Sequence, residues 1–163
     1  MLLALALAIP FETDFKQICG ARWLDRAAQI KAESNFNPNA RSFDGGEGLG
    51  QATKIWPEYI RRGWVPADST PFQVRPAIQG AHRYMLHLEP RVGGWIPGCG
   101  AYNAGTRSVT RAQALADLAG LPGPDAWLAT LPQVTGTKNS GYTIRYIRNI
   151  RAIRAGYRRE YGQ

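Results

Sequence analysis

The chain of 163 residues has only two cysteines and no spacing of side chains typical of a zinc or haem site. Cys19 and Cys99 lie far apart in the sequence. We expect both to be buried thiols, because free cysteine packs like a small apolar residue. A disulfide would require an oxidising compartment. The sequence indicates no metal and no other cofactor.

A long apolar run is also missing, which excludes a membrane-spanning segment of about 20 residues. Residues 1–10 (MLLALALAIP) are apolar but short, and they lack the basic start of a secretory signal. We therefore expect residues 1–12 to pack on the protein's own core or to anchor it to a partner. Residues 13–163 are expected to form one domain, which is long enough to bury a core without disulfides.

Acidic residues are in the minority, with 12 Asp and Glu against 20 Lys and Arg. The net charge of +8 and a pI near 9.9 favour an anionic partner. Nucleic acid, a membrane surface and a cell-wall polymer all satisfy this condition. The hydrophobic share of 44% is that of a folded globule rather than a disordered chain.

Strand patterns are scarce, so the expected class is mostly α, with a glycine-rich loop or small hairpin over 41–50 as the only β element. Apolar periodicity over 15–32 predicts helix, interrupted at Gly20. Segments 90–100 and 134–140 are expected to be loops. The other expected helices are 51–62 with Pro57 inside it, 75–88, 111–119, 125–131 and 142–160.

Glu33 is the first candidate for chemistry, because it closes the periodic stretch just before a loop. A carboxyl group at the end of a half-buried helix is partly removed from water, which raises its pKa. Such a group can hold a proton at neutral pH and act as a general acid on a glycosidic oxygen.

Three further motifs follow Glu33 in the order found in one known family. Residues 33–40 read ESNFNPNA, 48–51 read GLGQ, 101–105 read AYNAG and 143–147 read TIRYI. The chain resembles the SLT-type lytic transglycosylases, a branch of the lysozyme-like superfamily, over about residues 14–155. It departs from the family pattern at Gly50, where methionine is usual, and at Tyr142, where glutamate often stands.

The resemblance implies an α-rich lysozyme-like (α+β) fold, with the glycine-rich loop flanking the cleft. It also implies cleavage of the β-1,4 bond between N-acetylmuramic acid and N-acetylglucosamine in peptidoglycan. Glu33 would act first as acid and then as base, and the product would be a 1,6-anhydro-muramoyl end. Tyr146 would orient Glu33 through its hydroxyl. The expected substrate contacts are Ser34, Gly48, Leu49, Gln51, Tyr102, Asn103 and Tyr146.

Two carboxylates in the loop keep a second reaction open. If Asp44 or Glu47 held a water molecule as a base, the enzyme would be a hydrolytic muramidase with a reducing-end product. We favour the simpler interpretation, in which both are solvated loop residues beside Gly45 and Gly46. A third interpretation is an inactive lysozyme-like protein that binds cell wall or DNA in a virion.

The final expected helix carries a basic stripe opposite its isoleucines, which is most simply a solvated face. It can also bind an anionic wall polymer, phospholipid or DNA. His82 and His87 are expected on a helix surface or in packing. Glycan strands are the expected partner, and the expected location is a phage virion or the periplasm and cell wall, including a secretion apparatus. The stripe consists of Arg145, Arg148, Arg151, Arg154, Arg158 and Arg159.

Overall fold

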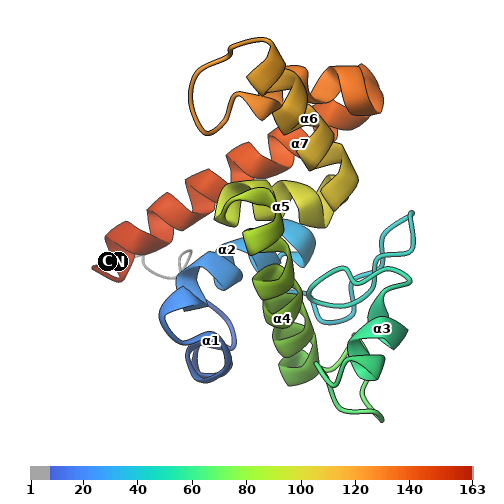
Figure 1. Cartoon of the computed structure of the whole chain (residues 1–163). Coiled ribbons are helices and arrows are strands. Elements are labelled where there is room, and N and C mark those ends of the chain that lie inside the picture. Colours follow the sequence, from blue (N-terminus) through green and yellow to red (C-terminus); the bar gives the residue numbers. More distant parts are fainter. Residues whose placement is uncertain (1–7, 163) are drawn as a thin grey trace. The chain divides into compact units, whose positions relative to one another are not determined.

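The computed structural model of the chain describes residues 8–162, so the expectation for residues 1–7 lies outside the described part. The described chain is mostly helical (Figure 1), and its β structure is limited to two isolated bridges, Arg41 with Glu47 and Glu47 with Ala52. The mostly α class is therefore confirmed. The elements are α1 (Glu12–Cys19), the 3-10 turn η2 (Gly20–Arg22), α2 (Trp23–Ser34), α3 (Trp56–Arg61), α4 (Val74–Val92), α5 (Trp95–Ala104), α6 (Thr106–Leu118) and α7 (Trp127–Glu160).

The chain divides into two compact units. Unit 1 comprises the described residues up to Tyr84 together with those from Ile150 onward, and unit 2 comprises Met85–Asn149. Helices α4 and α7 each contribute residues to both units.

The core of unit 1 is built on α1 and α2. Gly20 has φ 53 and ends α1, which confirms the predicted interruption of the first helical stretch. Every residue of α2 from Trp23 to Ile30 is buried, so this part of the helix is enclosed on all sides. Ile9, which precedes α1, is buried in the same core.

The second predicted helix begins later than expected. Gln51 has φ 47, a left-handed conformation that a helix cannot include, and α3 starts only at Trp56. Pro57 then lies in the first turn of α3, where its missing N–H has no helical partner to lose.

Unit 2 contains two helical segments that we predicted to be loops. Helix α5 includes Gly98 and Gly100, which are there for close packing rather than for a turn. A Cβ at Gly100 would lie 2.4 Å from the ring of Trp127, and one at Gly98 would lie 3.1 Å from Cγ of Glu89. Residues 134–140 belong to α7, and only Gly136 (φ 78, ψ 157) departs from helical geometry there.

Other boundaries in unit 2 differ by shorter stretches. Helix α4 continues to Val92 and includes Pro90, and α6 starts at Thr106 rather than at residue 111. Gly105 (φ 86) separates α5 from α6 without any intervening loop.

Both cysteines are buried, as expected. Burial raises the pKa of the Cys19 thiol to about 12, although the nearby charge of Arg26 acts in the opposite direction. Among residues 8–162, no three His, Cys, Asp or Glu side chains are grouped so that they could hold a metal ion. None of the described helices is long and apolar enough to cross a membrane.

Candidate active site

Glu33 lies in the last turn of α2, where the helix leaves the interior of unit 1. The residues before it are fully buried as far as Ile30, whereas residues 31–34 are half-buried. Asn35 and Phe36 then adopt left-handed conformations with φ 51 and φ 62, and the chain reverses. A half-buried carboxyl group at the end of a buried helix is the arrangement that the sequence predicts.

The reversal after Glu33 is fixed by contacts on both sides of the turn. The N–H of Asn35 donates to the carbonyl oxygen of Lys31 at 2.9 Å. Phe36 is buried and packs edge-on against Phe15, with 6.1 Å between ring centroids. The Ser34 hydroxyl donates to the carbonyl of Ile30 at 3.3 Å, within its own helix. These contacts restrict the positions that the Glu33 side chain can reach.

The second motif, residues 48–51, is bonded to the end of the first. The N–H of Gly48 donates to the carbonyl oxygen of Ala40 at 2.9 Å. Gly48 has φ 69, and a Cβ on it would lie 1.7 Å from the carbonyl oxygen of Pro71. Only glycine fits this position.

Leu49 ties the same motif to the core. Its side chain is completely buried in the cluster that contains Ile30 and Phe36, the residues on either side of Glu33. A ligand at this motif can therefore contact Leu49 through its backbone but not through its side chain.

Gln51 supports the loop from within. Its Nε2 donates to the carbonyl oxygen of Gly48 at 2.8 Å, and its Oε1 would lie 2.8 Å from a Cβ at Gly46. The amide therefore packs against the glycine-rich loop and holds it in shape. Glu33, Ser34, Gly48, Leu49 and Gln51 all belong to unit 1.

The two loop carboxylates have partners of their own. Glu47 accepts from Nη1 of Arg41 at 2.6 Å in an ion pair on the surface, and the Arg41 guanidinium lies 4.5 Å from the ring centroid of Phe72. Asp44 is exposed and accepts from the Ser42 hydroxyl at 2.5 Å. This surface ion pair and this turn are the arrangement expected of structural loop residues.

The third and fourth motifs meet in unit 2. Tyr102 and Asn103 lie in the last turn of α5, and Oδ1 of Asn103 accepts from the buried Thr143 hydroxyl of α7 at 2.8 Å. Tyr146 follows Thr143 by three residues on the same helix, so it lies on the same face one turn later. Tyr102 and Tyr146 are both half-buried.

The Asn103–Thr143 hydrogen bond provides a test of this arrangement. Thr143→Val and Asn103→Ala should each lower the free energy of unfolding by about 1 kcal/mol, and the double variant should lose less than the sum. Urea unfolding of the four proteins measures the coupling. Thr143→Ser keeps the hydroxyl and should lose less than Thr143→Val. Strictly additive losses would contradict the contact.

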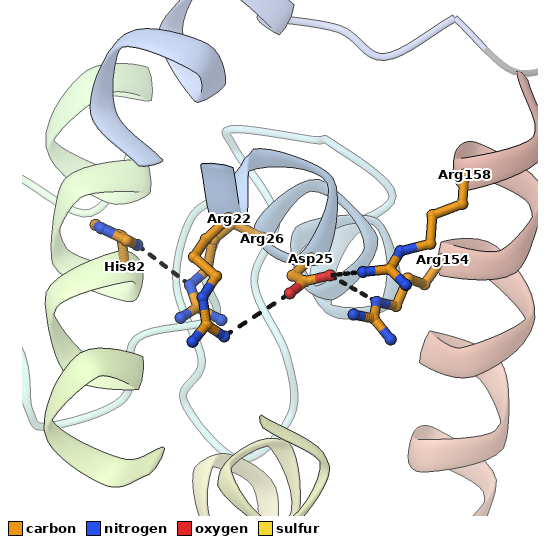
Figure 2. A network of polar contacts seen from close by, with 6 residues as sticks. All are labelled: Arg22, Asp25, Arg26, His82, Arg154 and Arg158. Atoms are coloured by element: carbon orange, nitrogen blue, oxygen red, sulfur yellow. Dashed lines mark hydrogen bonds and ion pairs between the residues drawn. The ribbon is translucent and has the colours of Figure 1, made fainter. Parts of the chain in front are cut away.

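An ion cluster around the buried Asp25 in unit 1 was not predicted from the sequence (Figure 2). Asp25, in the first turn of α2, accepts from Nε of Arg154 at 2.6 Å, and Arg158 and Arg22 lie 4.0 Å and 3.9 Å from its carboxylate. The expectation that the basic stripe is only a solvated face is therefore wrong for Arg154, which fastens the end of α7 to α2. Asp25 carries no motif that could have revealed this role.

A second unpredicted contact joins Arg26 of α2 to His82 of α4 (Figure 2). Arg26 is buried, and its Nε donates to Nδ1 of His82 at 3.2 Å. Burial, together with the charges of Arg26, Arg83 and Arg22, lowers the pKa of His82 to about 4. His82 is thus a neutral acceptor in packing, one of the two roles expected for it.

Acid should weaken unit 1 through this histidine. The pKa of His82 is about 4 in the folded protein against 6.5 when unperturbed, so the unfolded chain binds more protons between these values. The free energy of unfolding must then fall as the pH drops from 6.5 towards 4. His82→Gln keeps an acceptor for Arg26 but does not titrate, so its urea midpoint should fall less over this range. Parallel curves for the two proteins would contradict this origin of the acid sensitivity.

One known protein family matches the part of the chain that contains Glu33. The family model of the transglycosylase SLT domain matches residues 27–119, more than half of the chain, and this range contains the first three motifs but not Tyr146. No curated protein sequence matches the chain.

Solved structures show a shared fold. The chain is similar to the crystal structure of the 70 kDa soluble lytic transglycosylase from Escherichia coli, with a TM-score of 0.78 and 22% identity over 96% of this chain and 25% of that chain. A complex of the 70-kDa soluble lytic transglycosylase with bulgecin A gives the same values. The chain spans about a quarter of the length of these proteins. With its motifs in order and its lysozyme-like α-rich fold, the chain belongs to the transglycosylase SLT domain family.

Proposed function

We propose that the protein is a peptidoglycan lytic transglycosylase that cleaves the β-1,4 bond between N-acetylmuramic acid and N-acetylglucosamine. Membership of the SLT family supports this activity. The observation that carries the proposal is the position of Glu33, half-buried at the end of a buried helix and followed by a rigid reversal of the chain.

Glu33 performs both proton transfers in this mechanism. As a neutral acid it protonates the glycosidic oxygen as the bond to the muramoyl C1 breaks. As a carboxylate it then removes the proton from the muramoyl C6 hydroxyl, whose oxygen attacks C1 and closes the 1,6-anhydro ring. The nucleophile belongs to the substrate, so no second carboxylate and no water molecule are needed.

We further propose that Tyr146 contacts the glycan through its hydroxyl. The remaining residues offer neutral hydrogen-bonding groups or closely approachable backbone, which suit N-acetyl amides and sugar hydroxyls. The glycan contacts proposed are Ser34, Gly48, Leu49 through its backbone, Gln51, Tyr102 and Asn103.

A hydrolytic muramidase is the second candidate, with Asp44 or Glu47 as base. The Arg41 guanidinium bound to Glu47 and the Ser42 hydroxyl bound to Asp44 favour the lyase over this alternative. A base that activates water needs an acceptor directed at the water, whereas Oε1 of Glu47 and Oδ1 of Asp44 each accept from a loop donor.

Digestion of purified Gram-negative sacculi tests the activity. The protein should release soluble muropeptides whose masses are those of anhydro ends, one water lighter than the products of a muramidase. Absence of soluble products over a range of pH values would instead support the third candidate, an inactive wall- or DNA-binding protein.

The proposed place of action is the bacterial cell wall, reached from the periplasm, from a secretion apparatus or from a phage virion. The exposed arginines of the final helix, such as Arg148 and Arg159, are proposed to contact membrane phospholipid or DNA. Binding to anionic vesicles or to duplex DNA that weakens steeply with added salt would support this contact. Detection of the protein in purified virions would separate the phage location from the periplasmic one.

A further inference from the structure

Helix α2 carries three polar side chains on one face, next to apolar residues of the core. Arg26, Gln29 and Glu33 are spaced by three and four residues, so they lie within about 60° of one another around the helix axis. We call these three residues the polar ridge. Their apolar neighbours include Ala27, Ala28 and Ile30, all of them buried.

Gln29 is the unusual member of the polar ridge. It is 0% exposed, and neither its Oε1 nor its Nε2 has a hydrogen-bonding protein group within residues 8–162. Buried polar groups are nearly always hydrogen-bonded, because an unsatisfied amide in the interior costs free energy. An apolar residue of similar size would avoid this cost, so the amide requires an explanation.

The neighbours of Gln29 along the ridge suggest what the amide does. Arg26, one turn earlier, is 1% exposed and donates to His82, so polar groups continue inward from Gln29. Glu33 lies one turn later, about 6 Å further along the helix axis, where α2 reaches the half-buried zone. A side-chain amide both donates and accepts, as a bound water molecule requires.

We infer that Gln29 is a positioning residue for Glu33, and that it acts through ordered water held on the polar ridge. The amide satisfies its hydrogen bonds with this water, and the water in turn bonds to the carboxyl group one turn away. The orientation of the Glu33 carboxyl group therefore depends on a residue of its own helix as well as on the residues around it. This inference rests on the proposed function, in which Glu33 is the proton donor.

The first test observes the water directly and does not depend on activity. At 18.0 kDa the protein is suitable for NMR with isotope-labelled side-chain amides. The Nε2 protons of Gln29 should show nuclear Overhauser effects to long-lived water in the rotating and laboratory frames. A Gln29 amide with no water cross-peaks would overturn the inference, whether or not the enzyme is active.

The second test separates positioning from packing. Gln29→Leu should leave the urea midpoint unchanged or higher, since it removes an amide without a protein partner. Its kcat should fall about tenfold while KM stays within about twofold, because a displaced acid slows the chemical step more than binding. Gln29→Asn keeps an amide on a side chain that is one methylene shorter, and water can bridge the remaining distance. Its kcat should therefore fall less than that of Gln29→Leu.

Ile30→Val is the matched control, because Ile30 is equally buried on the same turn but lies off the polar ridge. It should lower the urea midpoint and leave kcat unchanged. If Gln29→Leu also left kcat unchanged in an enzyme that forms anhydro ends, Gln29 would be structural only. If the parent protein formed no anhydro ends, the proposed function would fail instead, and the NMR result would still decide whether Gln29 binds water.

Discussion

Glu33→Gln should reduce the release of muropeptides from sacculi by about a thousandfold or more. Glutamine has nearly the same size as glutamate and keeps a hydrogen-bonding side chain, but it cannot donate a proton to the glycosidic oxygen or take one from the C6 hydroxyl. General acid–base catalysis contributes about 10²–10⁴-fold to each step it serves, and Glu33 serves two. The rate is measured on the folded variant, with circular dichroism and the urea midpoint as the check of folding.

The loop carboxylates supply the controls for this experiment. Asp44→Asn and Glu47→Gln should leave the rate within about threefold of the parent, since neither residue takes part in the proposed reaction. If Glu47→Gln were as damaging as Glu33→Gln, the protein would use two carboxyl groups and the hydrolytic mechanism would be favoured. An active Glu33→Gln variant would remove Glu33 from the chemistry altogether.

Gly48→Ala should be the most damaging single change to the stability of the site. The new Cβ would lie 1.7 Å from the carbonyl oxygen of Pro71, and a backbone atom cannot turn aside as a flexible side chain can. The positive φ of 69 adds a second penalty for any residue other than glycine. Together they should lower the free energy of unfolding by about 3 kcal/mol or more.

Gly45→Ala separates the two penalties. Gly45 has φ 88 in the same loop, but no atom lies within 4 Å of the Cβ position. Its loss should be limited to about 1 kcal/mol from the backbone conformation. Chemical unfolding of both variants measures the difference, and equal losses would show that contact with Pro71 does not constrain the loop.

The ends of the first two helices could be predicted because single residues determine them. Gly20 interrupts the first stretch with a positive φ of 53, and Asn35 ends α2 in the left-handed conformation that terminates many helices. Helix α5 could not be predicted, because Gly98 and Gly100 weaken a helix locally and are compensated only by close contact with Glu89 and Trp127. The helical structure of this segment depends on tertiary packing, which the periodicity of apolar residues in the sequence does not reveal.

The motifs of the candidate site could be recognised in the sequence, because loops and turns restrict the residue types at fixed positions. The internal bonds of the motifs, such as Gly48 to Ala40 and Asn103 to Thr143, were not visible. The burial of Arg26 and Gln29 was equally hidden, since an amphipathic pattern places such residues in solvent. They are buried because α2 is enclosed on all sides as far as Ile30.

The most direct measurement is digestion of sacculi in water enriched in oxygen-18, followed by mass spectrometry of the glycan ends. Closure of the anhydro ring uses the substrate's own oxygen, so the muramoyl ends should carry no label and should be one water lighter than reducing ends. Reducing ends carrying oxygen-18 would show that water is the nucleophile, and would contradict the account of Glu33 as the single carboxylate of a lytic transglycosylase.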